Sequence, residues 1–143
     1  MNQKATSPES PLVSIERLVQ QARLAIDRDD QNLALKIVKA AVTRDPFNPS
    51  VLAQAGRLFR VRAQYDRSQR FLRIAAVSAP EAWSSWADLG ELHHEMGDTD
   101  SVIRFRSRAF RALPLASGNL LALAATLLEV GKLAPASRMF KRG

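Results

Sequence analysis

Two adjacent histidines and the glutamate after them, His93, His94 and Glu95, come closest to a metal-binding pattern in this sequence. A zinc site needs three or four ligands that converge on one point. Neighbouring residues of a helix point about 100° apart, so this trio does not converge. No third ligand follows at the spacing of a His-Glu-x-x-His motif. We therefore predict no bound metal, with His93 packed in the interior and His94 exposed.

Other residues that could carry catalysis lack the required context. The sequence has many serines but no Gly-x-Ser-x-Gly elbow, and it has no glycine-rich loop that could hold a phosphate. It also contains no cysteine, which excludes thiolate chemistry and disulfide bonds. We assign no catalytic residue and no cofactor, and we expect a protein without enzymatic activity.

Basic residues recur at one fixed interval along the sequence. The formal net charge is +7, and the charges are spread along the chain. Two interpretations remain open: a solvated outer face, or a basic stripe for phosphates or acidic partners. We do not expect nucleic-acid binding, because Phe71, Phe105 and Phe110 have the helical spacing of core residues and are not available for base stacking. The stripe consists of Lys36, Arg70, Arg104 and Arg138, with Lys39, Arg73, Arg108 and Arg111 beside it.

Length and composition are those of one globular domain. The chain has 143 residues, of which 46% are hydrophobic and 24% charged. Residues 1–13 contain two prolines and no apolar run, which indicates a disordered tail rather than a signal peptide. The longest uncharged stretch, 112–128, contains Pro114 and Gly118 and is too short to cross a bilayer. We expect a cytoplasmic protein without a transmembrane segment.

The spacing of apolar residues predicts eight helices and no strands. The first begins near Ser10 or Ser14, and Asn48 with Pro49 starts the third. Gly97 is expected to end the fifth helix in a left-handed conformation. The apolar faces of the first three helices cover 15–26, 33–42 and 52–59; the fourth helix runs over about 66–78, the fifth ends near 96, and the last three cover about 99–113, 120–131 and 133–143.

An internal repeat of about 34 residues organises these helices. One step of this interval back from Trp86, Gly90, Ala109 and Pro114 gives Leu52, Gly56, Ala75 and Pro80, and a second step gives Leu18, Ala22, Ala41 and Pro46. Glycine or alanine recurs at the positions where two helices of one repeat would cross closely. The repeat therefore predicts paired helices, and each pair leaves an apolar face for the next pair to cover.

The segment Trp86-x2-Leu89-Gly90, with His93 at the place of a tyrosine, resembles the tetratricopeptide repeat family. The resemblance covers residues 15–143 and implies an all-α, right-handed superhelical solenoid of antiparallel helix pairs. The repeats would be 15–48, 49–82, 83–116 and an incomplete 117–143, within one domain from residue 14 to 143. Arg106 departs from the pattern at a core aromatic position, and we expect Phe105 to take over its packing.

The resemblance also implies a function. Members of the family bind extended peptides or helices in a concave groove formed by the first helix of each repeat. The groove here would be basic at one end and acidic in the middle, with Arg57 and Arg60 exposed. Its matching positions are Arg23 and Asp27 in the first repeat, Arg57 and Arg60 in the second, and Glu91, His94 and Glu95 in the third.

We therefore expect a protein–protein interaction scaffold that binds a peptide or helix of a partner protein, including an acidic one. Two alternatives remain open. One is an N-terminal targeting module of a larger glycosyltransferase or sulfotransferase, which a reading frame continuing past Gly143 would favour. The other is a secretion chaperone, which is similar in size and repeat number.

The seventh predicted helix is apolar almost all round. Leu121 and Leu128 point into the groove in this register, where earlier repeats place charges. A helix that is apolar on every side is normally buried. We predict that this end is covered by a second copy of the chain or by further repeats, and self-association through the C-terminal repeat is the simpler expectation.

Overall fold

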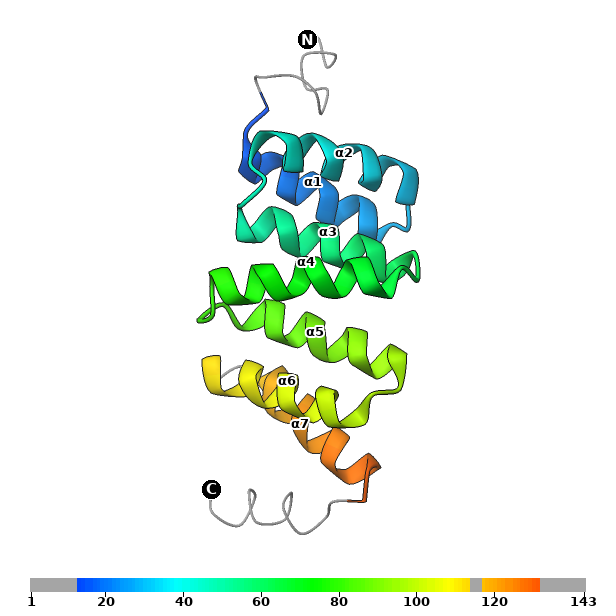
Figure 1. Ribbon diagram of the computed structural model, residues 1–143, viewed down its shortest axis with the longest axis vertical. Coiled ribbons are helices and arrows are strands. Elements are labelled where there is room, and N and C mark those ends of the chain that lie inside the picture. The colour runs from blue at the N-terminus through cyan, green and yellow to red at the C-terminus, as the bar shows by residue number, and fades with distance from the viewer. Residues whose placement is uncertain (1–12, 114–116, 132–143) are drawn as a thin grey trace. The chain divides into compact units, whose positions relative to one another are not determined.

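The computed structural model describes residues 13–113 and 117–131 of the chain. These ranges contain seven helices and no strand (Figure 1). The predicted all-α class is confirmed, and the eighth predicted helix, from about Leu133, lies outside the described residues, as do residues 1–12 of the expected tail. The helices are α1 (Ile15–Asp27), α2 (Gln31–Arg44), α3 (Pro49–Val61), α4 (Tyr65–Ser78), α5 (Trp83–Met96), α6 (Thr99–Ala112) and α7 (Ser117–Glu129).

Local signals start several helices as predicted. The Ser14 side chain accepts a hydrogen bond from the Arg17 amide at the start of α1 (3.2 Å). Asn48 caps α3 by accepting from the amide of Ser50, and Pro49 occupies the first helical position. These caps satisfy amide groups that have no partner within the helix.

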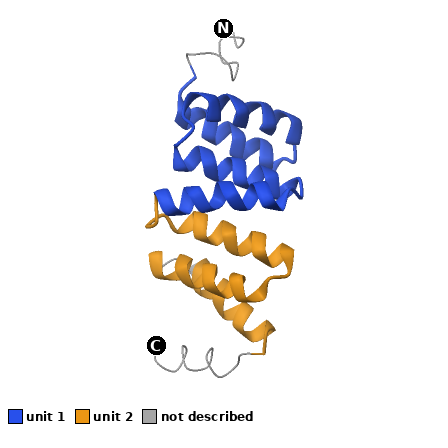
Figure 2. Cartoon of the chain, in the orientation of Figure 1, with its two compact units in different colours: residues 1–78 blue, residues 79–143 orange. Residues whose placement is uncertain are grey.

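The chain forms two compact units (Figure 2). Unit 1, residues 1–78, contains α1–α4, and unit 2, residues 79–143, contains α5–α7. Within each unit, consecutive helices run antiparallel (Figure 1). The boundary lies inside the predicted repeat 49–82, immediately after α4.

Unit 1 is built around a continuous apolar core from α1, α2 and α3. Leu18, Ala34 and Leu58 are fully buried in it. Val13 also belongs to this core with 2% exposure, although the sequence places it in the tail. The guanidinium group of Arg44 donates to the Val13 carbonyl group and so attaches the segment before α1 to the end of α2.

The two helices of a pair cross closely at glycine, as the repeat predicts. A Cβ atom added to Gly56 would lie 2.5 Å from Cγ of Leu72 on α4. Beside this crossing, the buried hydroxyl group of Ser68 donates to the Gly56 carbonyl group at 2.7 Å. In unit 2, a Cβ atom at Gly90 would lie 3.0 Å from Cγ of Arg106 on α6. Glycine therefore sets the distance between the helices of each pair.

The turn that ends the first helix of each repeat has one recurrent geometry. At the second turn, the Ala63 amide donates to the Arg60 carbonyl group at 2.9 Å. The Gln64 amide then donates to the Phe59 carbonyl group at 2.8 Å. This pair of bonds is the Schellman motif, which needs one residue with positive φ. Among the described residues, positive φ occurs at Asp29 (57°), Ala63 (58°), Gly97 (78°) and Gly131 (74°), each one repeat length after the one before.

Replacing Ala63 by glycine is expected to stabilise unit 1 by about 1 kcal/mol, because a Cβ atom is unfavourable at positive φ and glycine is not. Urea denaturation followed by circular dichroism measures the change. The matched control is Ala40→Gly, inside α2, which is expected to cost about 1 kcal/mol. If Ala63→Gly lowers the stability, the left-handed turn at this position is wrong.

Candidate functional site

A hollow of about 280 Å³ lies within unit 2. Residues of α5 and α7 form its two sides, and residues of α6 complete it. Its walls are mainly apolar and are built from small side chains, Ala87, Ala109 and Ala122, with the indole of Trp83 at 37% exposure. The small side chains leave the space open, and the exposed indole offers a rigid apolar surface for a ligand.

Arg106 is the central polar residue of the hollow. Its side chain is 12% exposed, and its Nη2 donates to Oε1 of Glu91 on α5 at 3.1 Å. Its Nη1 donates to the Thr126 hydroxyl group and, at 3.4 Å, to the Ala122 carbonyl group on α7. Gly90 leaves room for the stem of this arginine. Arg106 therefore links α5 and α7, and the Glu91 carboxylate, 52% exposed, remains accessible to a ligand.

Asn119 fixes the position of α7 at the edge of the hollow. Its side chain is buried at 5% exposure. Its Nδ2 donates to the carbonyl groups of Ala109 (3.1 Å) and Leu113 (3.3 Å), which end α6. The Ala109 carbonyl group also accepts from the Leu113 amide at 3.1 Å, whereas the carbonyl group of Leu113, the C-cap residue, lies beyond the last backbone bond of α6. The same residue thus ends one helix and positions the next.

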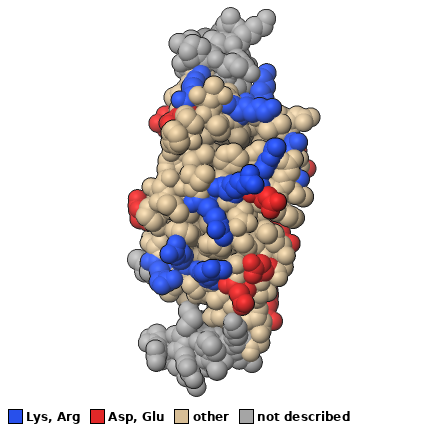
Figure 3. Space-filling view, viewed as in Figure 1, with Lys and Arg blue, Asp and Glu red and all other residues tan. Residues whose placement is uncertain are grey.

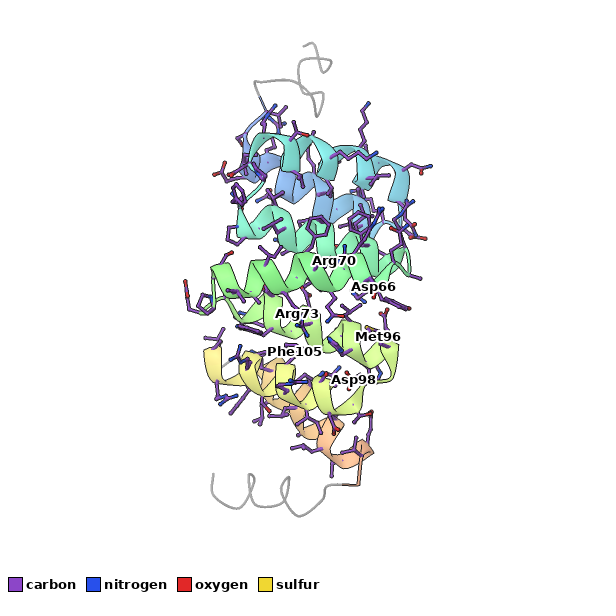
Figure 4. All side chains as sticks on the ribbon, viewed as in Figure 1. Asp66, Arg70, Arg73, Met96, Asp98 and Phe105 are labelled. Carbon is purple, nitrogen blue, oxygen red and sulfur yellow. The ribbon has the colours of Figure 1, made fainter. Side chains whose placement is uncertain are left out.

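Sequence reasoning missed Trp83 and Asn119 as site residues and noticed Arg106 only as a departure from the repeat pattern. A charged residue at a position where the pattern requires a core aromatic was the available signal. Phe105 takes over the packing, as predicted: it is 7% exposed, and its ring stacks on Trp86 (centroids 6.2 Å apart) and His93 (5.1 Å) of α5. In Figure 4 Phe105 is labelled on α6.

The predicted groove residues of unit 2 do not all lie at the hollow. Glu91 lines the hollow, whereas His94 and Glu95 are exposed further along α5 and do not line it. His93 is 4% exposed, so the prediction of one packed and one exposed histidine is confirmed. Among the described residues, no group of three or more His, Cys, Asp or Glu side chains is arranged to hold a metal ion.

Asp98 caps α6 beside the buried histidine. The Ser101 hydroxyl group donates to its carboxylate at 2.6 Å, and the Ser101 amide donates at 3.3 Å. These two hydrogen bonds, with a smaller contribution from His93 at 3.4 Å, hold the pKa of Asp98 below its usual value. The capping carboxylate therefore stays ionised to a lower pH than an ordinary aspartate does.

In unit 1, the predicted groove residues are Arg23 and Asp27 on α1 and Arg57 and Arg60 on α3. Arg23 and Asp27 are exposed. The prediction that Arg57 and Arg60 are also exposed is wrong: both are half-buried, and Nε of Arg60 is fully buried. Helix α3 packs against α1, α2 and α4, so fewer of its side chains lie in open solvent than the repeat register alone suggests.

One face of α7 is apolar and exposed. Leu121 is 67% exposed and Leu128 49%, and Ala125 lies between them on the same face. The opposite face is buried, where Leu123 and Leu127 pack against Ile103 and Phe110 of α6. The two predicted leucines therefore do lie on the surface of unit 2.

Comparison with known proteins identifies the fold. No protein-family model matches the chain, and no curated protein sequence does. Solved structures do match. MamA has a TM-score of 0.75 at 17% sequence identity, and the match covers 90% of this chain and 75% of MamA. PilF of Pseudomonas aeruginosa has a TM-score of 0.76 at 18% identity, over 90% of this chain and 59% of PilF. The TPR domain of Sgt2 from Aspergillus fumigatus has a TM-score of 0.74 at 17% identity, over 89% of this chain and 85% of that domain.

The chain has the tetratricopeptide-repeat fold. It is an all-α repeat solenoid, as the repeat interval predicts. In this fold α5 and α7 are the first helices of two successive repeats and α6 is the second helix of the pair that α5 begins. The hollow of unit 2 therefore lies on the side of the repeats where first helices are neighbours.

The basic residues found by their interval lie on second helices of the tetratricopeptide repeats. Lys36 on α2, Arg70 on α4 and Arg104 on α6 are all exposed, and Arg138 lies outside the described residues. Figure 3 shows basic side chains gathered over α6 in unit 2. None of the helices in the described ranges combines the length and apolar character needed to cross a lipid bilayer.

Proposed function

We propose that the protein is an adaptor that binds a peptide or helix of a partner protein through the first helices of its repeats. The hollow between α5 and α7 carries this proposal, because its surface is mainly apolar, it opens to solvent, and small side chains line it beside an exposed indole, with the polar side chains of Asp88, Glu91 and Arg106 among its lining. The tetratricopeptide-repeat fold supports a protein-interaction scaffold in general. The hollow adds a specific place for a ligand.

The chemistry of the hollow defines the ligand in unit 2. A volume of about 280 Å³ is at the lower limit of small-molecule pockets and suits one or two side chains of a partner. An apolar side chain would enter between Ala87 and Ala122 and lie against Trp83. The exposed carboxylate of Glu91 would accept hydrogen bonds from the backbone amides of the partner.

Unit 1 offers positive charge, opposite to that of the Glu91 carboxylate in unit 2. Arg23, Arg57 and Arg60 are proposed to bind acidic groups of the partner, and Asp27 lies on the same helix as Arg23. Guanidinium groups bind carboxylates through paired hydrogen bonds. In unit 2, His94 and Glu95 would extend the contact surface beyond Glu91 along α5.

The proposed binding site is tested by filling the hollow with larger side chains. Peptides that bind the full chain are selected from a displayed library, and their affinities are measured by the change in tryptophan fluorescence. The double substitution Ala87→Leu and Ala122→Leu is expected to weaken binding tenfold or more, which is about 1.4 kcal/mol. The control is Ala40→Leu on α2, away from the hollow. Equal affinities of all three proteins would show that the hollow is not the binding site.

The apolar face of α7 supports a second contact, self-association of the chain. Leu121, Ala125 and Leu128 form an exposed apolar stripe, and such stripes commonly mark interfaces between proteins. Light scattering at increasing protein concentration is expected to show a dimer, and Leu121→Glu with Leu128→Glu is expected to give a monomer. A wild-type protein that remains monomeric at high concentration contradicts this contact.

A further inference from the structure

The outer face of α6 carries three arginines in register. Arg104, Arg108 and Arg111 are all exposed and are spaced four and three residues apart, so they share one face of the helix. Every exposed residue of α6 is polar, and among them only Asp100 is acidic. Figure 3 shows the resulting cluster of basic side chains over this helix.

Neutral groups hold these arginines in place. The guanidinium carbon of Arg108 lies 4.5 Å from the centre of the Trp86 ring. That of Arg104 lies 5.6 Å from the centre of the Phe105 ring, and its Nη2 donates to the Ser101 hydroxyl group at 2.9 Å. A cation over an aromatic face keeps its charge while its position is restricted. A ligand would therefore find positive groups that are already partly ordered, which lowers the entropic cost of binding.

The third arginine is held by a neutral group as well, in this case a backbone carbonyl group. Nε of Arg111 donates to the Ser107 carbonyl group of its own helix at 3.4 Å. Within the described ranges, none of the three arginines forms an ion pair with a carboxylate. The carboxylates among the described residues of unit 2 therefore leave the positive charge of this face unpaired, which favours an anionic partner.

This face is separate from the hollow. Arg106 lies two residues from both Arg104 and Arg108 on the same helix. Two residues correspond to a rotation of about 200° around the helix axis, so Arg106 points to nearly the opposite side. The bonds of Arg106 to Glu91 and Thr126 agree with this direction.

The surroundings of the arginines select the class of partner. Single-stranded nucleic acids are bound by aromatic side chains that stack on bases, whereas Trp86 and Phe105 are only 6% and 7% exposed. Membrane binding by a helix requires apolar side chains that enter the lipid, and the exposed residues of α6 include none. A partner rich in aspartate and glutamate requires neither feature.

We propose that the outer face of α6, formed by Arg104, Arg108 and Arg111, binds an acidic segment of a partner protein in extended conformation. Arg104 and Arg108 lie about 6 Å apart along the helix axis at a rise of 1.5 Å per residue. Alternate side chains of an extended segment are about 6.6 Å apart. Carboxylates at alternate positions therefore match this interval, and each can accept two hydrogen bonds from one guanidinium group.

The experiment uses the full chain and a fluorescein-labelled ten-residue peptide in which Glu and Ser alternate. Fluorescence anisotropy at low salt measures its binding. The double variant Arg104→Glu with Arg111→Glu is expected to bind at least tenfold more weakly than the wild type. Arg108 is left in place because its guanidinium group covers Trp86. The matched control, Arg17→Glu with Arg28→Glu, changes the net charge equally at exposed sites in unit 1 and is expected to retain binding.

Circular dichroism checks that both double variants are folded. An equal loss of binding in the control overturns the proposal, because attraction to the net charge then explains the affinity. Absence of peptide binding in the wild type overturns it as well. Phosphatidylserine vesicles and a uridine decamer are tested in parallel. If either binds through Arg104 and Arg111 in preference to the peptide, the partner is not an acidic protein segment.

Discussion

Replacing Trp86 by alanine is expected to destabilise unit 2 by about 3–5 kcal/mol, the usual cost of truncating a buried aromatic side chain. The indole is 6% exposed and stacks on Phe105 with the ring centroids 6.2 Å apart. Its Nε1 donates to the Pro80 carbonyl group at 2.9 Å, and Arg108 covers its outer face. The truncation removes all of these contacts and leaves a cavity between α5 and α6.

Urea denaturation followed by tryptophan fluorescence measures this effect on unit 2 alone, because both tryptophans of the chain belong to that unit. Trp83 remains as the reporter in the variant. The control Trp86→Phe keeps an aromatic ring and loses mainly the hydrogen bond to Pro80, so it is expected to cost about 1–2 kcal/mol. A cost below about 1 kcal/mol for Trp86→Ala would contradict the packing described for α5 and α6.

The variant Gly56→Val is expected to destabilise unit 1 by about 2–3 kcal/mol, because it forces α3 and α4 apart. A Cβ atom alone would lie 2.5 Å from Cγ and 2.6 Å from Cδ2 of Leu72. Leu72 is fully buried, so its side chain has little room to move. The larger valine side chain adds further overlap. Circular dichroism during urea denaturation measures the loss.

Two further variants show whether the overlap with Leu72 is the cause. Leu72→Ala creates space at the crossing, so the cost of Gly56→Val in that background is expected to fall by at least about 1 kcal/mol, a coupling typical of residues in contact. Gly118→Ala is the control, because nothing lies within 4 Å of a Cβ atom at Gly118. It is expected to be neutral or to stabilise α7 by up to about 1 kcal/mol. Additive costs for Gly56 and Leu72 would exclude a direct overlap.

Much of the fold follows from the sequence because the relevant signals are local. The cap formed by Asn48 and Pro49 and the left-handed end at Gly97 depend on residues within one helical turn. The repeat interval then placed glycine at both close crossings, and the structure confirms Gly56 and Gly90 there. The helical spacing of the aromatic residues also indicated that the Phe105 side chain, and not that of Arg106, packs in the core.

The candidate site was predicted less completely. Of the seven groove residues named from the repeat register, Glu91 lines the hollow of unit 2. The walls come from Trp83 and Ala122, which belong to two different helices. Whether small residues leave an open space depends on the side chains facing them, and the sequence does not place those side chains.

The sequence by itself determined the helices, their pairing and the repeat, since helical periodicity and capping act over a few residues. The tertiary structure alone decided burial and side-chain direction. Arg60 is half-buried on a helix that packs against three others, and Arg106 reaches Thr126, 20 residues further along the chain. Even the left-handed turn at Ala63 follows from the packing of the helix pair, because alanine has no preference of its own for positive φ. Such properties depend on partners that are distant in sequence, and only the folded chain brings these together.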